Sequence, residues 1–198
     1  MQLGIVGHND LAIATHDRFV ASGIEVVSYE CTNAITSLQD LEMFRKKMTV
    51  PRIIWIFLPD GQNRTNVLGD FADKLDAGDL VIDVSECGLR ATTAIATNFS
   101  CRYVGYLEVD VDCGQYQVGE TSGTAFVYGS SDYFEVALEG LEIMSSPARP
   151  IHISDRVGSG HPENLVPATL GAWPGMPEVL GSLSWLRQCP KQDDDIKW

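Results

Sequence analysis

The residues with the clearest chemical meaning follow the first apolar run of the chain. They are, in order, Gly7, His8, Asn9, Asp10, Leu11 and Ala12. A strand that runs into a helix through Gly-x-Gly-x-x-Gly or Gly-x-Gly-x-x-Ala holds the diphosphate of a dinucleotide, because glycine allows a tight turn and a close backbone approach. Gly7 and Ala12 keep the first and last positions of this pattern, whereas Asn9 stands at the middle one. The pattern predicts the turn and an altered diphosphate contact.

Two side chains in this turn oppose an anionic ligand. Asn9 places a side chain where the diphosphate oxygens approach. Asp10 either caps its own helix, which occupies N–H groups that a phosphate needs, or adds a like charge in the first turn. A like charge at about 4 Å costs on the order of 1–4 kcal/mol near a protein surface. Both alternatives predict weakened dinucleotide binding.

The remaining candidate cofactor contacts follow the second and third apolar runs. Glu30 comes 23 positions after Gly7, near the spacing of the acid that binds a ribose 2′-hydroxyl. If a cofactor binds, Glu30 favours NAD over NADP, and the alternative is an ordinary charged strand end. Leu58 and Pro59 complete the predicted cofactor set. A different small molecule in the same cleft, hydrogen-bonded to His8 and Asn9, is a further alternative.

Other catalytic chemistry has little support in the sequence. The four histidines show no metal-ligand spacing, and the five cysteines form no Cys-x-x-Cys pair, so no metal site is predicted. Cys31, Cys87 and Cys101 lie near predicted strand ends and are expected to pack in or near the core. No Gly-x-Ser-x-Gly segment occurs. His161 is a weak acid–base candidate, and a loop histidine is the alternative.

The charge of the chain limits its partners. The net charge is −13, which argues against nucleic acid, because phosphate contacts need clustered Lys and Arg. The stretch from Tyr103 to Ala148 holds eight acidic residues and no Lys or Arg, so it offers no cation to an anionic substrate; a solvated acidic surface is the alternative. No apolar run reaches the roughly 20 residues that span a bilayer. A cytoplasmic location without membrane contact is expected.

The elements that must position these residues alternate between apolar runs and segments of helical period. Such alternation predicts an α/β fold with a doubly wound, mostly parallel sheet and helices on both faces. Strands are expected at about 2–6, 24–29, 52–58, 80–84, 103–109, 124–129 and 151–153, the sixth at an edge or antiparallel. Helices are expected at about 10–22, 37–48, 65–76, 90–97 and 131–145. Gly23 is expected to end the first helix in a left-handed conformation, and Thr65 to cap the third.

The composition changes towards the end of the chain. Residues 1–155 are expected to form one dinucleotide-binding-like domain, and 156–198 a Pro- and Trp-rich tail with at most one short helix at 178–188. Such a tail cannot build a second domain. Its Trp and Leu side chains need a surface, either that of the same domain or that of a partner. A homodimer or a protein partner bound through this tail is therefore expected.

Several segments occur in the order and at roughly the spacing of one known family. They are residues 1–7, 23–30, 52–59, 78–83 and 157–161. On these segments, residues 1–161 resemble the N-terminal domain of the 6-phosphogluconate dehydrogenase and β-hydroxyacid dehydrogenase family. The resemblance implies a Rossmann-like fold, binding of NAD or NADP, and oxidation of a 3-hydroxy acid.

The sequence departs from this family where the family does its chemistry. Aligned on Gly158 and Gly160, the catalytic lysine of the family's G-x-G-x-x-x-K-x-x-x-N segment falls at Asn164, and no Lys occurs between Lys74 and Lys191. Prolines interrupt the helix that leads to the family's all-helical second domain, which is expected to be missing. The D-V-G-T-S-G-G and G-G-N-S motifs are unrecognisable near 105–111 and 84–87.

These losses support two hypotheses. The first is a non-catalytic pseudoenzyme, a Rossmann-domain protein that acts as a binding or assembly module. It has no catalytic residues, and it binds no cofactor or, if any, NAD. The alternative is an NAD(P)-dependent oxidoreductase that acts on a hydroxy acid and whose active site is completed by another chain.

Overall fold

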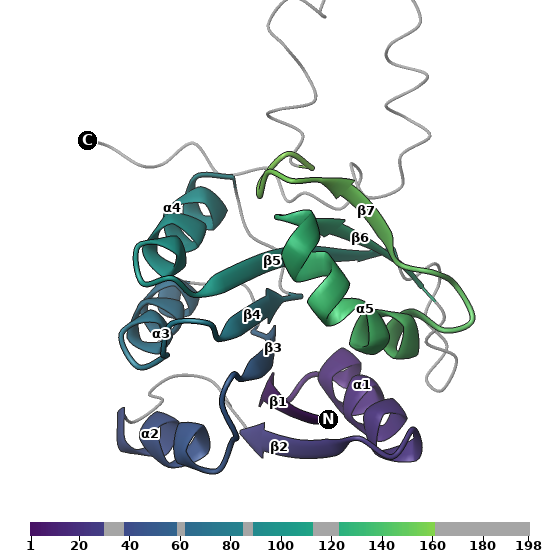
Figure 1. The fold of residues 1–198 in the computed structure, drawn as a ribbon, viewed down its shortest axis with the longest axis horizontal. Coiled ribbons are helices and arrows are strands. Elements are labelled where there is room, and N and C mark those ends of the chain that lie inside the picture. The colour runs from purple at the N-terminus through teal and green to yellow at the C-terminus, as the bar shows by residue number, and fades with distance from the viewer. Residues whose placement is uncertain (30–37, 59–61, 85–88, 113–122, 161–198) are drawn as a thin grey trace, which may run out of the picture. The chain divides into compact units, whose positions relative to one another are not determined.

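The computed structural model describes residues 1–29, 38–58, 62–84, 89–112 and 123–160 (Figure 1). Strands and helices alternate from the N-terminus as far as the fifth strand, as expected for a parallel sheet with helical crossovers. The strands are β1 (Gln2–Gly7), β2 (Glu25–Tyr29), β3 (Ile53–Phe57), β4 (Leu80–Asp83), β5 (Gly105–Asp112), β6 (Thr124–Tyr128) and β7 (Ile151–Ser154). The helices are α1 (Asp10–Ala21), α2 (Leu38–Lys46), α3 (Gln62–Ala72), α4 (Leu89–Ser100) and α5 (Ser131–Ser145).

The strands form one seven-stranded sheet in the order β2-β1-β3-β4-β5-β6-β7. Neighbours from β2 to β5 are parallel, β6 runs antiparallel to β5, and β7 runs parallel to β6. The predicted doubly wound, mostly parallel sheet is confirmed. Of the two alternatives for the sixth strand, the antiparallel one is confirmed, because β7 forms the edge beyond it.

Two apolar layers hold the helices against the sheet. One lies under α1 and α5 and contains Phe19, Trp55 and Leu141, which are almost fully buried. The other lies under α2, α3 and α4 and contains Ile56, Leu68 and other buried side chains. Trp55 and Ile56 are adjacent in β3 yet belong to opposite layers, because successive side chains of a strand point to opposite faces. Figure 1 shows α1 and α5 apart from the other three helices.

Three local predictions are settled by the structure. Gly23 has a φ of 79°, which confirms the left-handed end after α1. Thr65 was expected to cap the third helix, but α3 already begins at Gln62, so that prediction is wrong. Cys101 was expected near the core and is exposed, because it lies in the turn that follows α4. Cys31 and Cys87 lie outside the described residues.

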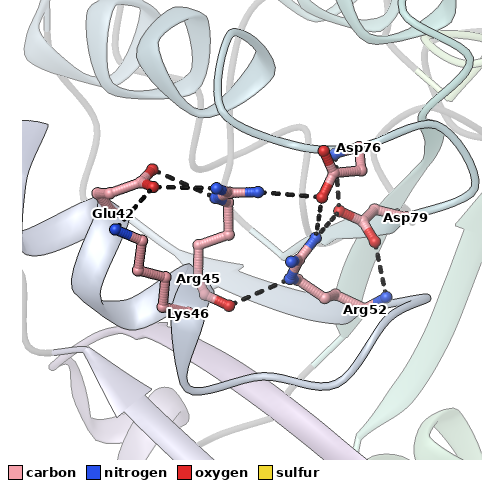
Figure 2. Close-up of polar contacts among 6 residues, drawn as sticks. All are labelled: Glu42, Arg45, Lys46, Arg52, Asp76 and Asp79. Atoms are coloured by element: carbon pink, nitrogen blue, oxygen red, sulfur yellow. Dashed lines mark hydrogen bonds and ion pairs between the residues drawn. The ribbon is translucent and has the colours of Figure 1, made fainter.

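Polar contacts tie the amino-terminal edge of the sheet to α2 (Figure 2). Asp79, only 1% exposed, accepts hydrogen bonds from the backbone N–H of Arg52 at 2.7 Å and from its guanidinium at 2.8 Å. Arg52 also donates to the carbonyl of Arg45 at 3.2 Å and to Asp76 at 2.8 Å. These buried charges are paired and hydrogen-bonded, as low-dielectric surroundings require.

The chain divides into two units, Met1–Gly160 and His161–Trp198. The second unit lies outside the described residues, so the predicted boundary at 155 and the predicted helix at 178–188 stay predictions. Within the described residues, no helix has both the length and the apolar character needed to cross a membrane.

Candidate functional site

The strand order creates a topological switch point at the carboxyl ends of β1 and β3. From β1 the chain crosses through α1 to β2 on one side, and β3 then pairs with the other side of β1. The segments after β1 and β3 therefore lead to helices on opposite faces of the sheet. Open α/β sheets bind ligands in the crevice outside the strand ends at such a switch point. The turn that the sequence singled out, residues 7–12, follows β1 at this switch point.

Gly7 is required by both its conformation and its surroundings. Its φ of +128° is one that side chains rarely adopt, and it pairs with Phe57 of β3. A Cβ added at Gly7 would overlap the carbonyl oxygen of Phe57. Gly7 therefore lets β1 turn into α1 directly beside the neighbouring strand, which is the role predicted for the first glycine of the pattern.

The cap of α1 is Asn9 and not Asp10. The amide oxygen of Asn9 accepts a hydrogen bond from the N–H of Ala12 at 2.8 Å, and its backbone is extended at φ −93° and ψ 171°. Asp10 is the first helical residue and lies one position too late to cap. The expectation that Asp10 caps its own helix is therefore wrong. Asn9 adds a Cβ that glycine would lack, but its amide folds back onto the helix.

Capping leaves part of the helix start open to an anion. Asn9 satisfies the N–H of Ala12 and its carbonyl accepts from Ile13 at 3.0 Å. For the N–H groups of Asp10 and Leu11, no acceptor lies in the described part of the chain. Two donors and the positive end of the helix dipole thus lie at the switch point. The exposed carboxylate of Asp10 stands in the same turn and opposes a negative ligand.

The structure describes only some of the other predicted site residues. His8 is exposed beside Asn9 at the end of β1, and Ala12 is buried, which allows α1 to pack closely. Leu58 directly follows β3, but its side chain is 5% exposed and belongs to the layer under α2, α3 and α4. It would therefore present its backbone to a ligand. The positions of four further candidates lie outside the described residues: Glu30, Pro59, His161 and Asn164.

A second group of polar residues lies on β4, β5 and β6, and the sequence analysis did not find it. Glu108 is 5% exposed, and its carboxylate accepts a hydrogen bond from the backbone N–H of Gly158 at 2.7 Å. It is in register with Asp83 of β4 and with Tyr128 of β6. Asp83 is fully buried and accepts a hydrogen bond from the hydroxyl of Tyr106 at 2.7 Å.

The sequence of this region indicates only a solvated acidic surface, or a stretch that offers no cation to an anionic substrate. One available signal was the alternation at Glu108 and Asp110, which places both on one face of a strand. Burial, then the charges of Asp110 and Glu108, raise the pKa of Tyr128 to about 12. Its phenol therefore stays protonated at neutral pH. No group of three or more metal-ligating side chains occurs among the described residues.

Solved structures share this fold at low sequence identity. The imine reductase of Streptomyces aurantiacus matches with a TM-score of 0.65 and 16% identity, over 90% of this chain and 64% of that chain. The 3-hydroxyisobutyrate dehydrogenase of Mycobacterium tuberculosis, solved with L-serine, matches with a TM-score of 0.63 and 15% identity, over 80% and 56%. The imine reductase of Myxococcus stipitatus in complex with NADP+ matches with a TM-score of 0.65 and 15% identity, over 92% and 62%.

The chain thus spans less than two thirds of the length of these structures. No curated protein matches it. Residues 5–156 match the family model described as the NAD binding domain of 6-phosphogluconate dehydrogenase. This match covers most of the chain and confirms the resemblance of the strand segments. The chain belongs to the family of 6-phosphogluconate dehydrogenase NAD-binding domains.

Proposed function

We propose that residues 1–160 bind a nicotinamide dinucleotide, NAD in preference to NADP, as the cofactor domain of an oxidoreductase. The observation that carries the proposal is the turn at residues 7–12. Gly7 keeps the strand-to-helix geometry, Asn9 folds its amide away onto the helix, and the N–H groups of Asp10 and Leu11 remain as donors. A diphosphate needs this combination of backbone donors and helix dipole.

The residues present fit such a cofactor, though less tightly than the full glycine pattern would. The diphosphate would lie against the N–H groups of Asp10 and Leu11, and the cofactor would supply hydride transfer. Two related structures carry such cofactors, because imine reductases of Myxococcus stipitatus are solved with NADP+ and, as a V8 variant, with NAD+. Glu30 supports the preference for NAD through its spacing from Gly7. Asp10 lowers the affinity through its charge.

A second candidate function is a non-catalytic module that acts through binding or assembly. The observation that favours it is chemical: the family's lysine position carries Asn164, and the sequence has no Lys between Lys74 and Lys191. No other Lys in this stretch of the sequence replaces the family's lysine, which would take the proton of a hydroxy acid. In this function the Trp-rich tail, including Trp173 and Trp185, contacts a second copy or a protein partner.

Calorimetric titration of the full chain with NAD and NADP tests the first proposal. We expect NAD to bind more tightly than NADP, and Asp10→Asn to raise the NAD affinity about fivefold, because about 1 kcal/mol of charge repulsion is removed. Asp17→Asn is the matched control, since Asp17 is an exposed acid of the same helix beyond its first turn. Glu30→Ala should weaken NAD binding only.

The proposal fails if neither the wild-type chain nor Asp10→Asn binds either cofactor, or if Asp17→Asn has the same effect as Asp10→Asn. The two candidate functions separate in a second readout on the same samples. If the chain is non-catalytic, adding 6-phosphogluconate with NAD or NADP leaves the reduced-cofactor absorbance at background. Turnover well above background contradicts the non-catalytic function.

A further inference from the structure

Strand β7 forms one edge of the seven-stranded sheet, and in the described part of the chain no strand pairs with its outer side (Figure 1). Its side chains alternate between exposed and half-buried. His152 faces α5, because its ring centre lies 5.1 Å from that of Phe134. Ile151 and Ile153 therefore point to the opposite face of the sheet, where they are 45% and 49% exposed. An edge strand with exposed apolar side chains is a template for pairing with another chain.

The face that carries these two isoleucines has no described helix at this end of the sheet. The layer under α2, α3 and α4 includes described side chains of β1 to β5 but none of β6 or β7. Phe126 of β6 is the register partner of Ile151 and is half-buried on the same face. The opposite edge strand, β2, differs, because its exposed residues Glu25 and Ser28 are polar. Of the two edges, β7 therefore gains more from being covered.

Charges of opposite sign stand at the two ends of β7. Arg149, an exposed cation without a described ion pair, comes two residues before the strand. Asp155 directly follows the strand, and its side chain is 71% exposed. Its carboxylate accepts a hydrogen bond from the backbone N–H of Ser131 at 2.8 Å, which holds it in place. A strand with these ends complements a second copy of itself in antiparallel orientation, because each cation then meets the anion of the other copy.

One register of such a pair serves both the apolar and the charged residues. A two-fold axis through His152 sets Ile151 opposite the partner's Ile153, at about 5 Å between Cβ atoms, and brings Arg149 level with the partner's Asp155. Moving the axis by one residue sets an isoleucine opposite a charge, either Arg149 opposite Ile153 or Ile151 opposite Asp155. The sequence around β7 is therefore self-complementary about its second residue.

The pair is short and closed. Pro150 has no N–H to donate and directly precedes β7, and the strand ends at Ser154, so backbone pairing is limited to the four residues of β7. Arg156 falls opposite Ala148 and meets no cation. Because both copies use the same strand, no β7 edge is left for a third copy. So short a contact predicts a weak dimer, with a dissociation constant on the order of 10–100 µM.

We propose that β7 is a dimerisation surface, on which a second copy of this chain continues the sheet in antiparallel orientation about a two-fold axis at His152. Ile151 and Ile153 of the two copies cover one another on the face opposite α5. The strands of the two copies run in opposite directions, so the turns at residues 7–12 lie at opposite edges of the joined sheet. The dimer is thus independent of the proposed cofactor function, and it does not require the Trp-rich tail.

Sedimentation velocity of the full chain tests the dimer. Between about 1 and 300 µM we expect the mass to rise from 21.7 kDa towards twice that value; at the lowest concentration mass action leaves the monomer. Ile153→Lys should weaken association at least tenfold, because the pair would bury two ammonium groups. Arg149→Glu should weaken it about threefold or more, since it sets an acid beside the partner's Asp155. Val20→Lys is the control, because Val20 is 52% exposed on α1 and the same charge enters there.

Disulfide trapping tests the register. A mixture of Ile151→Cys and Ile153→Cys chains should form covalent dimers several times faster than either variant alone. Directly opposite Cβ atoms suit a disulfide, whereas those of two identical positions, offset by two residues, lie about 7–8 Å apart. The wild-type chain gives the background from its five cysteines.

A chain that stays monomeric up to about 300 µM overturns the inference, and so does equal weakening by Ile153→Lys and Val20→Lys. Equal trapping in the mixture and in the single variants refutes the two-fold axis at His152. A dimer that persists in Ile153→Lys but is lost in Trp173→Ala/Trp185→Ala assigns the association to the tail and removes β7 from it. Circular dichroism confirms that the variants are folded, and the trapping experiment tests β7 without introducing a charge.

Discussion

At the scale of single residues, Asn9 makes the start of α1 stable without a ligand. Its side chain satisfies one N–H of the first turn, and the exposed carboxylate of Asp10 interacts favourably with the helix dipole. A bound diphosphate would supply both functions in a protein with the full glycine pattern. The unliganded turn is therefore partly satisfied here, and a dinucleotide gains less from binding to it.

Tyr103 is the residue where the backbone conflicts most clearly with its side chain. Its φ is 58°, the left-handed region, and its side chain is 79% exposed, so little packing offsets the strain. We expect Tyr103→Asn to raise the free energy of unfolding by about 0.5–1 kcal/mol, because Asn tolerates this conformation. Urea denaturation measures the change. Tyr103→Phe is the control and should leave the urea midpoint unchanged. A loss of stability in Tyr103→Asn would show that the aromatic ring makes a stabilising contact.

At the scale of elements, ion pairs join α2 to the loop before β4 (Figure 2). Arg45 donates to Glu42 at 3.0 Å and to Asp76 at 3.0 Å, while the buried Arg52 donates to Asp76 at 2.8 Å. The hydrogen bond from Arg45 lowers the pKa of Glu42, and the one from Arg52 lowers that of Asp76, with a further contribution from Arg45. These acids bind protons less readily when folded than when unfolded.

The sign of the pH dependence follows from these lowered pKa values. Their stabilising effect is fully present above the ordinary values of 4.5 for Glu42 and 3.8 for Asp76, and is lost as the pH falls through the folded values. We expect the urea midpoint to fall between pH 6 and pH 3, and to fall less steeply in Arg45→Gln. Arg149→Gln, an exposed cation without a described ion pair, is the control. Equal slopes in wild type and Arg45→Gln would refute this assignment.

At the scale of the whole described unit, contacts between α1 and α5 connect the first described helix with the last one. Arg18 of α1 donates to the carbonyl of Met144 at 3.1 Å and to that of Ser146 at 2.6 Å, at the end of α5. The last carbonyls of a helix have no partner within it, so this guanidinium serves as a cap from a distant element. The contact helps to hold α5 on the same face of the sheet as α1.

Replacing Arg18 tests this connection. We expect Arg18→Met to lower the free energy of unfolding by about 1–3 kcal/mol, because charge-assisted hydrogen bonds are lost while much of the aliphatic contact remains. Arg18→Lys should lose less, since it keeps a cationic donor. Urea denaturation monitored by circular dichroism provides the measurement. Wild-type stability in Arg18→Met would show that the carbonyls at the end of α5 are satisfied without it.

Much of the fold was predictable because its signals are local. A helix buries one stripe and a parallel strand buries both faces, so apolar spacing located every strand and helix of the described residues to within a few positions. Boundaries were less secure where capping decides them, as at Thr65. In the turn, the choice between Asn9 and Asp10 as cap depended on a shift of one residue, which side-chain types alone do not fix, because Asn and Asp cap almost equally well.

The sequence by itself determined the alternation of strands and helices and the requirement for glycine at position 7. It also determined the excess of acidic charge and the absence of a lysine where the family has one. Only the tertiary structure decided which side chains meet. The pairing of β5 with β6 sets Tyr128 opposite Glu108, across 20 positions of sequence. Such contacts depend on strand register, and a shift of one residue would turn every side chain of β6 to the other face.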